Sequence, residues 1–235
     1  MCTHDPSGMS GVFIAGTDTG VGKTCVTAAL VYALRRDGID AVAMKPLATG
    51  KAREGVFESE DAEILARYSD ADKDEYRLIN PVFLSEEASP YMACKLLNAS
   101  IDMGKVFSAY NTLKDRHEFL LVEGIGGVMV PISSDYYVID MMKDMGLPVI
   151  IVARAKVGTI NHTLLTVNAC RDNGLRVVGV VVNMIDYSNK VEAYTPSMIE
   201  ELSGIPVIGS IPLLHDINNS IEKLAEYIRY DLIIS

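Results

Sequence analysis

The sequence predicts one α/β domain, spanning residues 1–235, with a doubly wound and mainly parallel sheet of about six or seven strands flanked by helices. Three observations lead to this prediction. The expected strands are continuous apolar runs, which is typical of strands buried on both faces. Strand-like and helix-like segments alternate along the chain, as they do in βαβ units. A chain of 235 residues with 49% apolar side chains is also long enough to bury one full core.

The first strand and the first helix are expected on either side of a loop of small residues. Residues 12–15 form a β-branched and aromatic run after a polar tail, which predicts a strand. Residues 24–36 carry apolar side chains at helical spacing. Gly38 favours the end of this helix, because glycine readily adopts the left-handed conformation of a helix cap.

The same alternation continues through the rest of the chain. Short apolar runs predict the further strands, and amphipathic spacing predicts the further helices. The expected strands are residues 41–44, 119–122, 148–152, 177–182 and 206–209. The expected helices are residues 60–68, 91–97, 101–117, 160–173 and 217–230.

Composition excludes several classes of protein. The net charge is −10 and no run of lysines and arginines occurs, so we expect no nucleic-acid partner. The N-terminus lacks the pattern of a signal peptide and no apolar run reaches the length of a membrane helix, so we expect a cytoplasmic protein with no membrane partner. The isolated cysteines suggest neither a zinc site nor disulfides, and they are Cys2, Cys25, Cys94 and Cys170.

The loop at residues 16–24, GTDTGVGKT, is the strongest motif in the chain. It follows an expected strand and opens an expected helix, which is the context of a phosphate-binding P-loop. Small residues let backbone N–H groups approach phosphate oxygens, Lys23 would reach the β- and γ-phosphates, and Thr24 would bind Mg²⁺. The first glycine of the usual spacing is replaced by Thr17, with Gly16 one residue earlier. A glycine turn that only caps the helix is the alternative, and the Gly-Lys-Thr sequence argues against it.

Other polar residues directly follow expected strands, at the edge where ligands bind in doubly wound sheets. Glu123 follows residues 119–122, and a carboxylate there favours a Mg²⁺ ligand over a simple strand-terminal acid. For Lys45 alone, the pattern favours a solvated strand-end lysine, with a second phosphate-facing cation as the alternative. Asn183 fits an adenine-reading amide and a turn-forming residue equally well.

Three acidic residues near the start of the helix at 60–68 cannot be ranked from their spacing. Helix capping and complementarity to the helix dipole would explain acids such as Glu60, Asp61 and Glu63 in a first turn without any role in a site. The sequence pattern therefore leaves open which of them, if any, belongs to the site.

Taken together, these motifs resemble the dethiobiotin synthetase family, a family of P-loop enzymes. Each segment is weakly diagnostic alone, but all follow in family order and spacing from residue 16 to about residue 214. The segments that carry the resemblance are residues 16–24 (GTDTGVGKT), 45–50 (KPLATG), 58–62 (ESEDA), 122–128 (VEGIGGV) and 158–162 (GTINH), with Asn183, Ile211 and Pro212.

The resemblance implies an ATP-dependent cyclo-ligase of biotin biosynthesis that uses Mg²⁺ and forms C–N bonds. One amine of 7,8-diaminopelargonate would capture CO₂ as a carbamate. The carbamate oxygen would attack the γ-phosphate of ATP and form a carbamic–phosphoric anhydride. The second amine would close the ureido ring, and the products would be dethiobiotin, ADP and phosphate.

The resemblance also implies roles for individual residues. Thr24, Asp61 and Glu123 would ligate Mg²⁺, and Lys23 and Lys45 would be catalytic. Thr49, Lys45, Thr159, Ile160 and Asn161 would contact the substrate, the last three of these across the interface of a homodimer. The nucleotide would be bound by Thr19, Gly20, Val21, Gly22, Lys23, Thr24, Cys25, Asp61, Glu123, Gly124, Ile125, Gly126, Asn183, Met184, Pro212, Leu213 and Leu214.

The sequence departs from the family pattern at a few positions. Gly20 replaces an acid that some members carry before the residue equivalent to Val21, and Ile125 replaces the usual alanine. Val128 stands where some members have tryptophan. These departures concern the fit of the nucleotide more than the reaction.

Two other functions remain as alternatives. One is a regulatory P-loop ATPase of the partition type, but such proteins carry a lysine five residues before Lys23, where this chain has Asp18. The other is a non-catalytic nucleotide-sensing module. Synthetases linked to an amidotransferase need an additional glutaminase domain, for which 235 residues leave no room.

Overall fold

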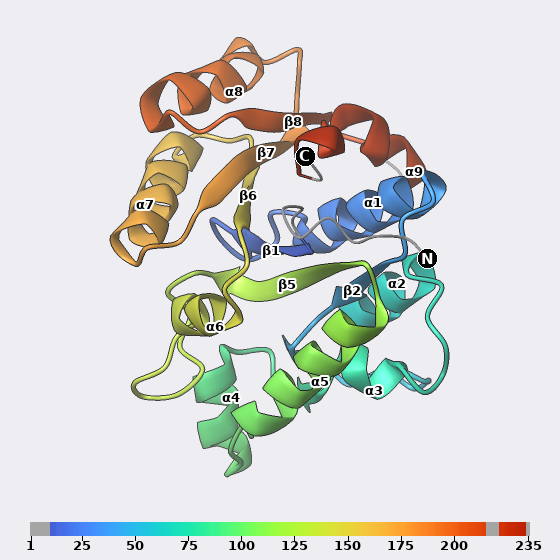
Figure 1. Cartoon of the computed structure of the whole chain (residues 1–235). Helices are drawn as coiled ribbons and strands as arrows, with labels where there is room; N and C mark the ends of the chain where they lie inside the picture. The colour runs from blue at the N-terminus through green and yellow to red at the C-terminus, as the bar shows by residue number, and fades with distance from the viewer. Residues whose placement is uncertain (1–9, 215–220, 234–235) are drawn as a thin grey trace.

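The computed structural model describes residues 10–214 and 221–233 and confirms the doubly wound α/β fold (Figure 1). Six parallel strands form the central sheet in the order β2-β5-β1-β6-β7-β8, and β3 pairs with β4 in a small second sheet. The strands are β1 (Gly11–Gly16), β2 (Ala41–Met44), β3 (Leu47–Thr49), β4 (Val82–Leu84), β5 (Phe119–Gly127), β6 (Val149–Arg154), β7 (Val177–Ile185) and β8 (Val207–Pro212).

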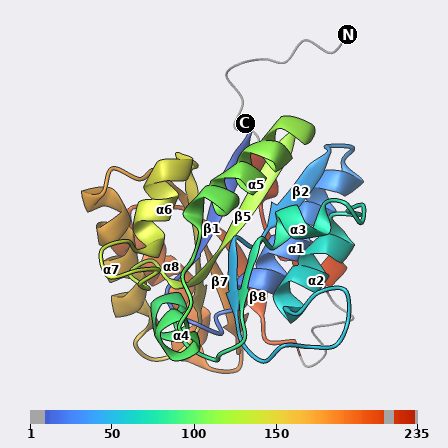
Figure 2. The ribbon, with the colours of Figure 1, turned by 90° about the horizontal axis from the view of Figure 1, so that it is seen from below.

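Helices cover both faces of the central sheet, so each face has its own apolar core. One core packs α5, α6, α7 and α8 on the sheet, and the other packs α1, α2 and α9. Figure 2 shows α5 lying in front of β5, which it contacts. The helices are α1 (Lys23–Arg36), α2 (Glu60–Tyr68), α3 (Tyr76–Ile79), α4 (Pro90–Leu97), α5 (Met103–Arg116), α6 (Val138–Met145), α7 (Thr159–Asp172), α8 (Lys190–Ser203) and α9 (Ile221–Leu224).

The topology places a ligand edge at the centre of the sheet. β1 lies between β5 and β6, and the chain winds away from β1 in both directions. The carboxyl ends of these neighbouring strands therefore open a crevice, which is where doubly wound sheets bind ligands. None of the helices in the described residues is long and apolar enough to cross a membrane.

The structure adds elements that the sequence analysis did not predict. They are β3, β4, the short helix α3, the helix α6 and the helix α8. β3 and β4 have only three residues each, which is too few to give a periodic signal. Helix α8 contains Pro196, a residue that usually breaks a helical pattern.

The prediction of one continuous helix over residues 217–230 is wrong for the part that the structure describes; residues 217–220 lie outside it. Helix α9 ends at Leu224 and gives way to short 3₁₀ turns. Ile228 then forms an antiparallel bridge with Gly209, and the Arg229 guanidinium donates to the carbonyl of Val207 at 2.8 Å. This segment covers the free edge of β8, which would otherwise leave backbone groups unpaired.

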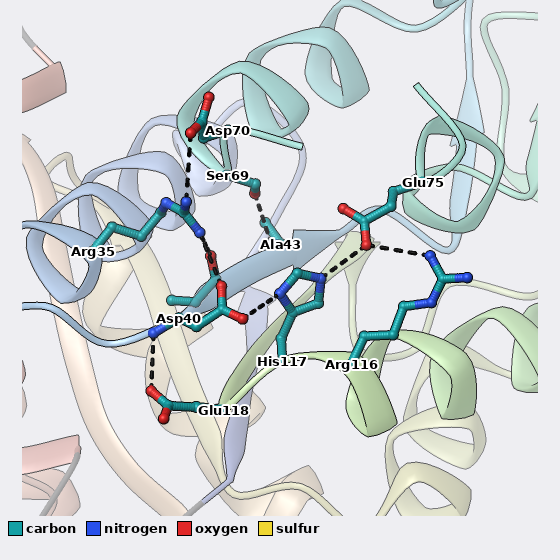
Figure 3. A network of polar contacts seen from close by, with 10 residues as sticks. Arg35, Asp40, Ala43, Ser69, Asp70, Glu75, Arg116, His117 and Glu118 are labelled. Carbon is teal, nitrogen blue, oxygen red and sulfur yellow. Dashed lines mark hydrogen bonds and ion pairs between the residues drawn. The ribbon is translucent and has the colours of Figure 1, made fainter. Parts of the chain in front are cut away.

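A polar network fixes the amino-terminal ends of β2 and β5 (Figure 3). The His117 ring lies between two carboxylates, with Nδ1 3.0 Å from Asp40 and Nε2 3.1 Å from Glu75. Glu75 also lies 3.5 Å from the Arg116 guanidinium, and Asp40 pairs with Arg35 at 3.2 Å. Because Asp40 precedes β2 and His117 precedes β5, the network joins the starts of two neighbouring strands and the start of α3.

The first prediction concerns this network. Replacing His117 with alanine should lower the free energy of unfolding by about 1–3 kcal/mol, because the buried Glu75 carboxylate loses a partner. Urea denaturation followed by circular dichroism measures the change. His162→Ala removes an exposed histidine on α7 and is the matched control, expected to change stability by less than about 0.5 kcal/mol. Equal stability of the His117 variant and the parent would contradict the role of the network.

Candidate functional site

The loop between β1 and α1 has the backbone of a phosphate cradle. Gly20 and Gly22 adopt positive φ angles of 72° and 91°, which turn successive N–H groups toward one side. A Cβ atom at Gly22 would clash with the Asn183 amide nitrogen. Only glycine therefore fits at this position, at the entrance of α1.

Lys23 begins α1 and folds back over this loop. Its ammonium donates to the carbonyl oxygen of Asp18 at 3.0 Å, above the place where phosphates would bind. Burial, together with repulsion from Lys45, lowers the pKa of Lys23 to about 8, against the attraction of Glu123. An anion bound in the loop would stabilise the charged form of this lysine.

Lys45 is buried, which the sequence pattern alone did not predict. Its Nζ atom donates to Asp61 Oδ2 at 2.8 Å and to Glu123 Oε1 at 2.5 Å, and its side chain is only 4% exposed. Burial opposes the charge of Lys45, but the attraction of Glu123 and Asp61 outweighs it and raises the pKa of the lysine. Burial likewise opposes the charge of Asp61, but Lys45 lowers the pKa of that carboxyl.

Strand register brings these three residues together. β2 pairs with β5 in parallel up to Met44 and Val122, so the next residues, Lys45 and Glu123, leave the sheet side by side. Asp61 comes from the first turn of α2, which Ser59 caps by accepting a hydrogen bond from the backbone of Ala62. Among the three acids that the sequence left unranked, Asp61 is the one that contacts Lys45, whereas Glu60 and Glu63 lie near Arg53.

The site has a donor set that suits Mg²⁺. Thr24 donates to Glu123 Oε1 at 2.8 Å, and the other carboxylate oxygen of Glu123 is buried without a hydrogen-bond partner among the described residues. The described part of the chain holds no group of three His, Cys, Asp or Glu residues placed to bind a metal. Mg²⁺ commonly uses one or two carboxylates with waters and phosphate oxygens, so the two acids and the Thr24 hydroxyl fit this ion.

A cavity of about 730 Å³ lies over these residues and unites most of the predicted site. Burial, together with the nearby charge of Glu123, raises the pKa of Cys25 in its wall to about 11. The sequence analysis missed Glu87, Ala88 and Ser89, which follow β4 and carry no motif. The predicted residues that line the cavity are Thr19, Gly20, Gly22, Lys23, Thr24, Cys25, Lys45, Thr49, Asp61, Glu123, Ile125 and Gly126.

Steric crowding explains why two positions after the apolar run of β5 are glycines. A Cβ atom at Gly124 would lie 2.9 Å from the Phe13 ring, and one at Gly126 would lie 2.7 Å from Val130. Ile125 between them packs against the core that contains α5 and α6 and lines the cavity. Ile125, one of the departures from the family pattern, therefore lies on the cavity wall.

The predicted nucleotide residues of the later strands lie outside the cavity lining, and Asn183 and Met184 lie beside the P-loop. The buried Asn183 donates to the carbonyl oxygen of Val21 at 3.0 Å and accepts from the backbone of Met184 at 2.9 Å. Pro212 ends β8, and Leu213 donates its N–H to Ile185 at the end of β7. Leu214 packs against the core under α1.

The predicted substrate residues at the start of α7 also lie outside the cavity lining. Thr159 is buried, Ile160 is half-buried and Asn161 is exposed on the surface of the protomer. Their side chains therefore do not complete the cavity from within one chain.

The fold and the loop geometry define a P-loop nucleotide-binding protein. A ParA-family ATPase from Chlorobium tepidum TLS superposes with a TM-score of 0.57 at 16% identity, covering 95% of this chain and 99% of that chain. The cell-division protein MinD from Aquifex aeolicus gives a TM-score of 0.56 at 16% identity, with 95% of each chain covered. At this low identity the likeness establishes the fold alone.

Sequence comparison gives the family. Residues 10–220 match a family model described as an AAA domain. The ATP-dependent dethiobiotin synthetase BioD of Nitrosopumilus maritimus is 42% identical, over 90% of this chain and 92% of its own length. The protein of the same name from Methanocaldococcus jannaschii is 38% identical, over 91% of this chain and 99% of its own length. The chain belongs to the ATP-dependent dethiobiotin synthetase family, as the sequence motifs predicted, and the family uses ATP and Mg²⁺.

The second prediction concerns Gly22. Gly22→Ala should weaken MgATP binding at least about tenfold, because a methyl group displaces Asn183 and the positive φ is strained. Isothermal titration calorimetry measures the affinity. Gly20→Ala is the matched control, since its φ is also positive but no atom lies within 4 Å of the added methyl group. A larger loss from Gly20→Ala than from Gly22→Ala would contradict the steric argument.

Proposed function

We propose that the cavity couples ATP cleavage to the closure of a ureido ring on 7,8-diaminopelargonate. One amine of the substrate adds to CO₂ and releases a proton, which gives a carbamate. The carbamate oxygen displaces ADP from the γ-phosphorus and gives a carbamic–phosphoric anhydride. The second amine attacks the carbonyl carbon, phosphate leaves, and dethiobiotin forms.

The observation that carries this proposal is the buried Lys45 beside the P-loop. A regulatory ATPase needs cations only for the nucleotide, whereas here a second buried lysine lies between Asp61 and Glu123 and lines the same cavity as Lys23. Such a cation stabilises charge on a transferring phosphoryl group and on a carbamate, because both are anions at the reacting centre.

The proposed roles follow from the positions of the side chains. Lys23 holds the β- and γ-phosphates from the first turn of α1. Thr24, Asp61 and Glu123 would hold Mg²⁺, which would supply positive charge against the phosphates. Lys45 must then exchange part of its carboxylate contacts for contacts with the substrate, since Glu123 Oε1 is shared between Thr24 and Lys45.

We place the substrate amines toward Thr49, on the side of the cavity away from the P-loop. Thr49 ends β3, directly downstream of Lys45, and Gly50 and Ser89 line the cavity next to it. A substrate held there lies between the strand end that carries Lys45 and the start of α4. The nucleotide residues Asn183, Met184, Pro212, Leu213 and Leu214 fit an adenine beyond the P-loop.

The third prediction tests this function. The purified protein with MgATP, bicarbonate and 7,8-diaminopelargonate should release phosphate and form dethiobiotin in equal amounts. Lys45→Ala should lower kcat about 100- to 1000-fold, because the transferring group loses its stabilising charge. Lys23→Ala should in addition weaken MgATP binding. Lys105→Ala removes an exposed lysine on α5 and should leave the rate unchanged.

ATP hydrolysis that does not depend on diaminopelargonate would contradict this reaction. It would favour the regulatory ATPase, and tight ATP binding without turnover would favour the sensor.

We also propose a homodimer in which the start of α7 completes the partner's cavity. Asn161 is exposed and lies outside the cavity lining, although family resemblance gives Thr159, Ile160 and Asn161 contacts with the substrate. Contact from a second copy would reconcile these observations. One domain over residues 1–235 and a cytoplasmic location stay predictions.

The fourth prediction tests the shared site by mixing two variants with impaired activity. Lys45→Ala and Asn161→Ala should each be weakly active, and an equimolar mixture after subunit exchange should recover about a quarter of the parent activity, from one intact site in each mixed dimer. Dethiobiotin formation measures the recovery. A mixture no more active than its components, or a fully active monomer, would overturn the proposal.

A further inference from the structure

The backbone at Lys45 leaves the sheet and needs new hydrogen-bond partners. The pairing of β2 with β5 ends at Met44, and β3 begins only at Leu47. Lys45 and Pro46 lie between these strands and both are buried. A buried backbone N–H or C=O group that lacks a partner is costly, so the groups of Lys45 must be satisfied from elsewhere.

The last residue of α3 and the residue after it supply both partners. The Lys45 N–H donates to the carbonyl oxygen of Ile79 at 2.7 Å. The side-chain amide nitrogen of Asn80 donates to the carbonyl oxygen of Lys45 at 2.7 Å and to that of Val82 at 3.1 Å. One amide group therefore joins the end of β2 to the start of β4.

We propose that Asn80 is a positioning residue that holds Lys45 in its catalytic place. This inference rests on the proposed function of Lys45. The Lys45 ammonium meets Asp61 and Glu123 only if its backbone leaves β2 at the observed point. The two hydrogen bonds to the Lys45 backbone fix that point, and the pairing of Leu47 with Val82 continues the same alignment into β3 and toward Thr49.

The chemistry of this position suits asparagine. Its NH₂ group carries two donors on one atom, whereas serine has one donor and an ionised aspartate has none. The backbone of Asn80 is extended, with φ −132° and ψ 82°, as favoured before Pro81 and at the end of α3. The side chain is thereby directed at the two carbonyl oxygens that it bridges.

Because of its position, Asn80 should affect turnover through Lys45 without affecting nucleotide binding by the P-loop. Lys23 and Thr24 belong to the loop and helix after β1, whereas the Asn80 amide donates to the carbonyl oxygens of Lys45 and Val82. Loss of the Asn80 donors should therefore displace Lys45 while the phosphate cradle stays intact. Substitution of a residue that only supports the fold would lower both kcat and the affinity for MgATP, and not kcat alone.

The experiment compares Asn80→Asp and Asn80→Ala with the parent in dethiobiotin formation and in MgATP binding. We expect kcat to fall about 10- to 100-fold, because a small displacement of a catalytic group has effects of this size. The Kd for MgATP should change by less than about twofold, because Asn80 acts on Lys45 and not on the loop that binds the phosphates. If Asn80→Asp does not fold, Asn80→Ser keeps one donor and should give an intermediate kcat.

Asn173→Asp is the matched control. Asn173 also donates from its side-chain amide to a backbone carbonyl, that of Ala169 at 2.9 Å, but it lies at the end of α7 and outside the cavity lining. The same substitution there should leave kcat and the MgATP affinity unchanged. A parallel loss of kcat in both variants would identify a general effect of stability and overturn the proposal.

A second readout does not depend on the reaction. Reaction with acetic anhydride followed by peptide mass spectrometry reports the exposure of Lys45, which is buried in the parent protein. Asn80→Asp should accelerate acetylation of Lys45 several-fold, with no change in the Asn173→Asp control. If the parent made no dethiobiotin, the proposed reaction would fail while this readout still tested Asn80. Unchanged acetylation of Lys45 together with unchanged kcat would overturn the positioning role.

Discussion

The structure depends on the cost of burying Lys45 and Glu123. Each charge would be strongly unfavourable alone in the interior, so they must meet with good geometry. Their meeting requires that β2 and β5 be neighbours in register, although the two residues are 78 positions apart in the chain. The same constraint brings Asp61 and Thr24 to the site, because the pair needs further hydrogen bonds.

Helix α3 links the two ends of this arrangement. Glu75, just before α3, is hydrogen-bonded to the His117 ring and forms an ion pair with Arg116 at the amino-terminal ends of the strands. Ile79 and Asn80, at the other end of α3, hold the backbone of Lys45. Residues 75–80 are therefore linked to both ends of β2, and displacement of α3 would disturb the strand starts and Lys45 together.

Much of the fold could be predicted because its signals are local. Continuous apolar runs gave the six strands of the central sheet, and Gly22-Lys23-Thr24 after the first strand identified the phosphate loop. The burial of Lys45 could not be predicted in this way, since it depends on the register of β2 with β5 and on an acid from α2. Only the resemblance to the dethiobiotin synthetase family assigned Lys45 and Asp61 to the site, because the spacing of the residues did not.

Asn80 shows the same limit, because no motif surrounds it. Its role appears only once the end of β2 and the start of β4 are placed in space. Helix α8 was missed for a local reason, since Pro196 interrupts its pattern and packing of Ile199 on the sheet outweighs that cost.

Asn183 illustrates how one residue can serve the loop and the ligand. The sequence suited an adenine contact and a turn equally well, and the structure shows the amide held by Val21 and Met184. An asparagine amide offers two donors and two lone pairs, so each side keeps one further bond. The hydrogen bond to Val21 fixes the entrance of the P-loop. It uses only one N–H of the amide, so the second N–H and the second lone pair of the oxygen are still available to a ligand. Positioning the phosphate loop and reading a base are therefore compatible roles for this side chain.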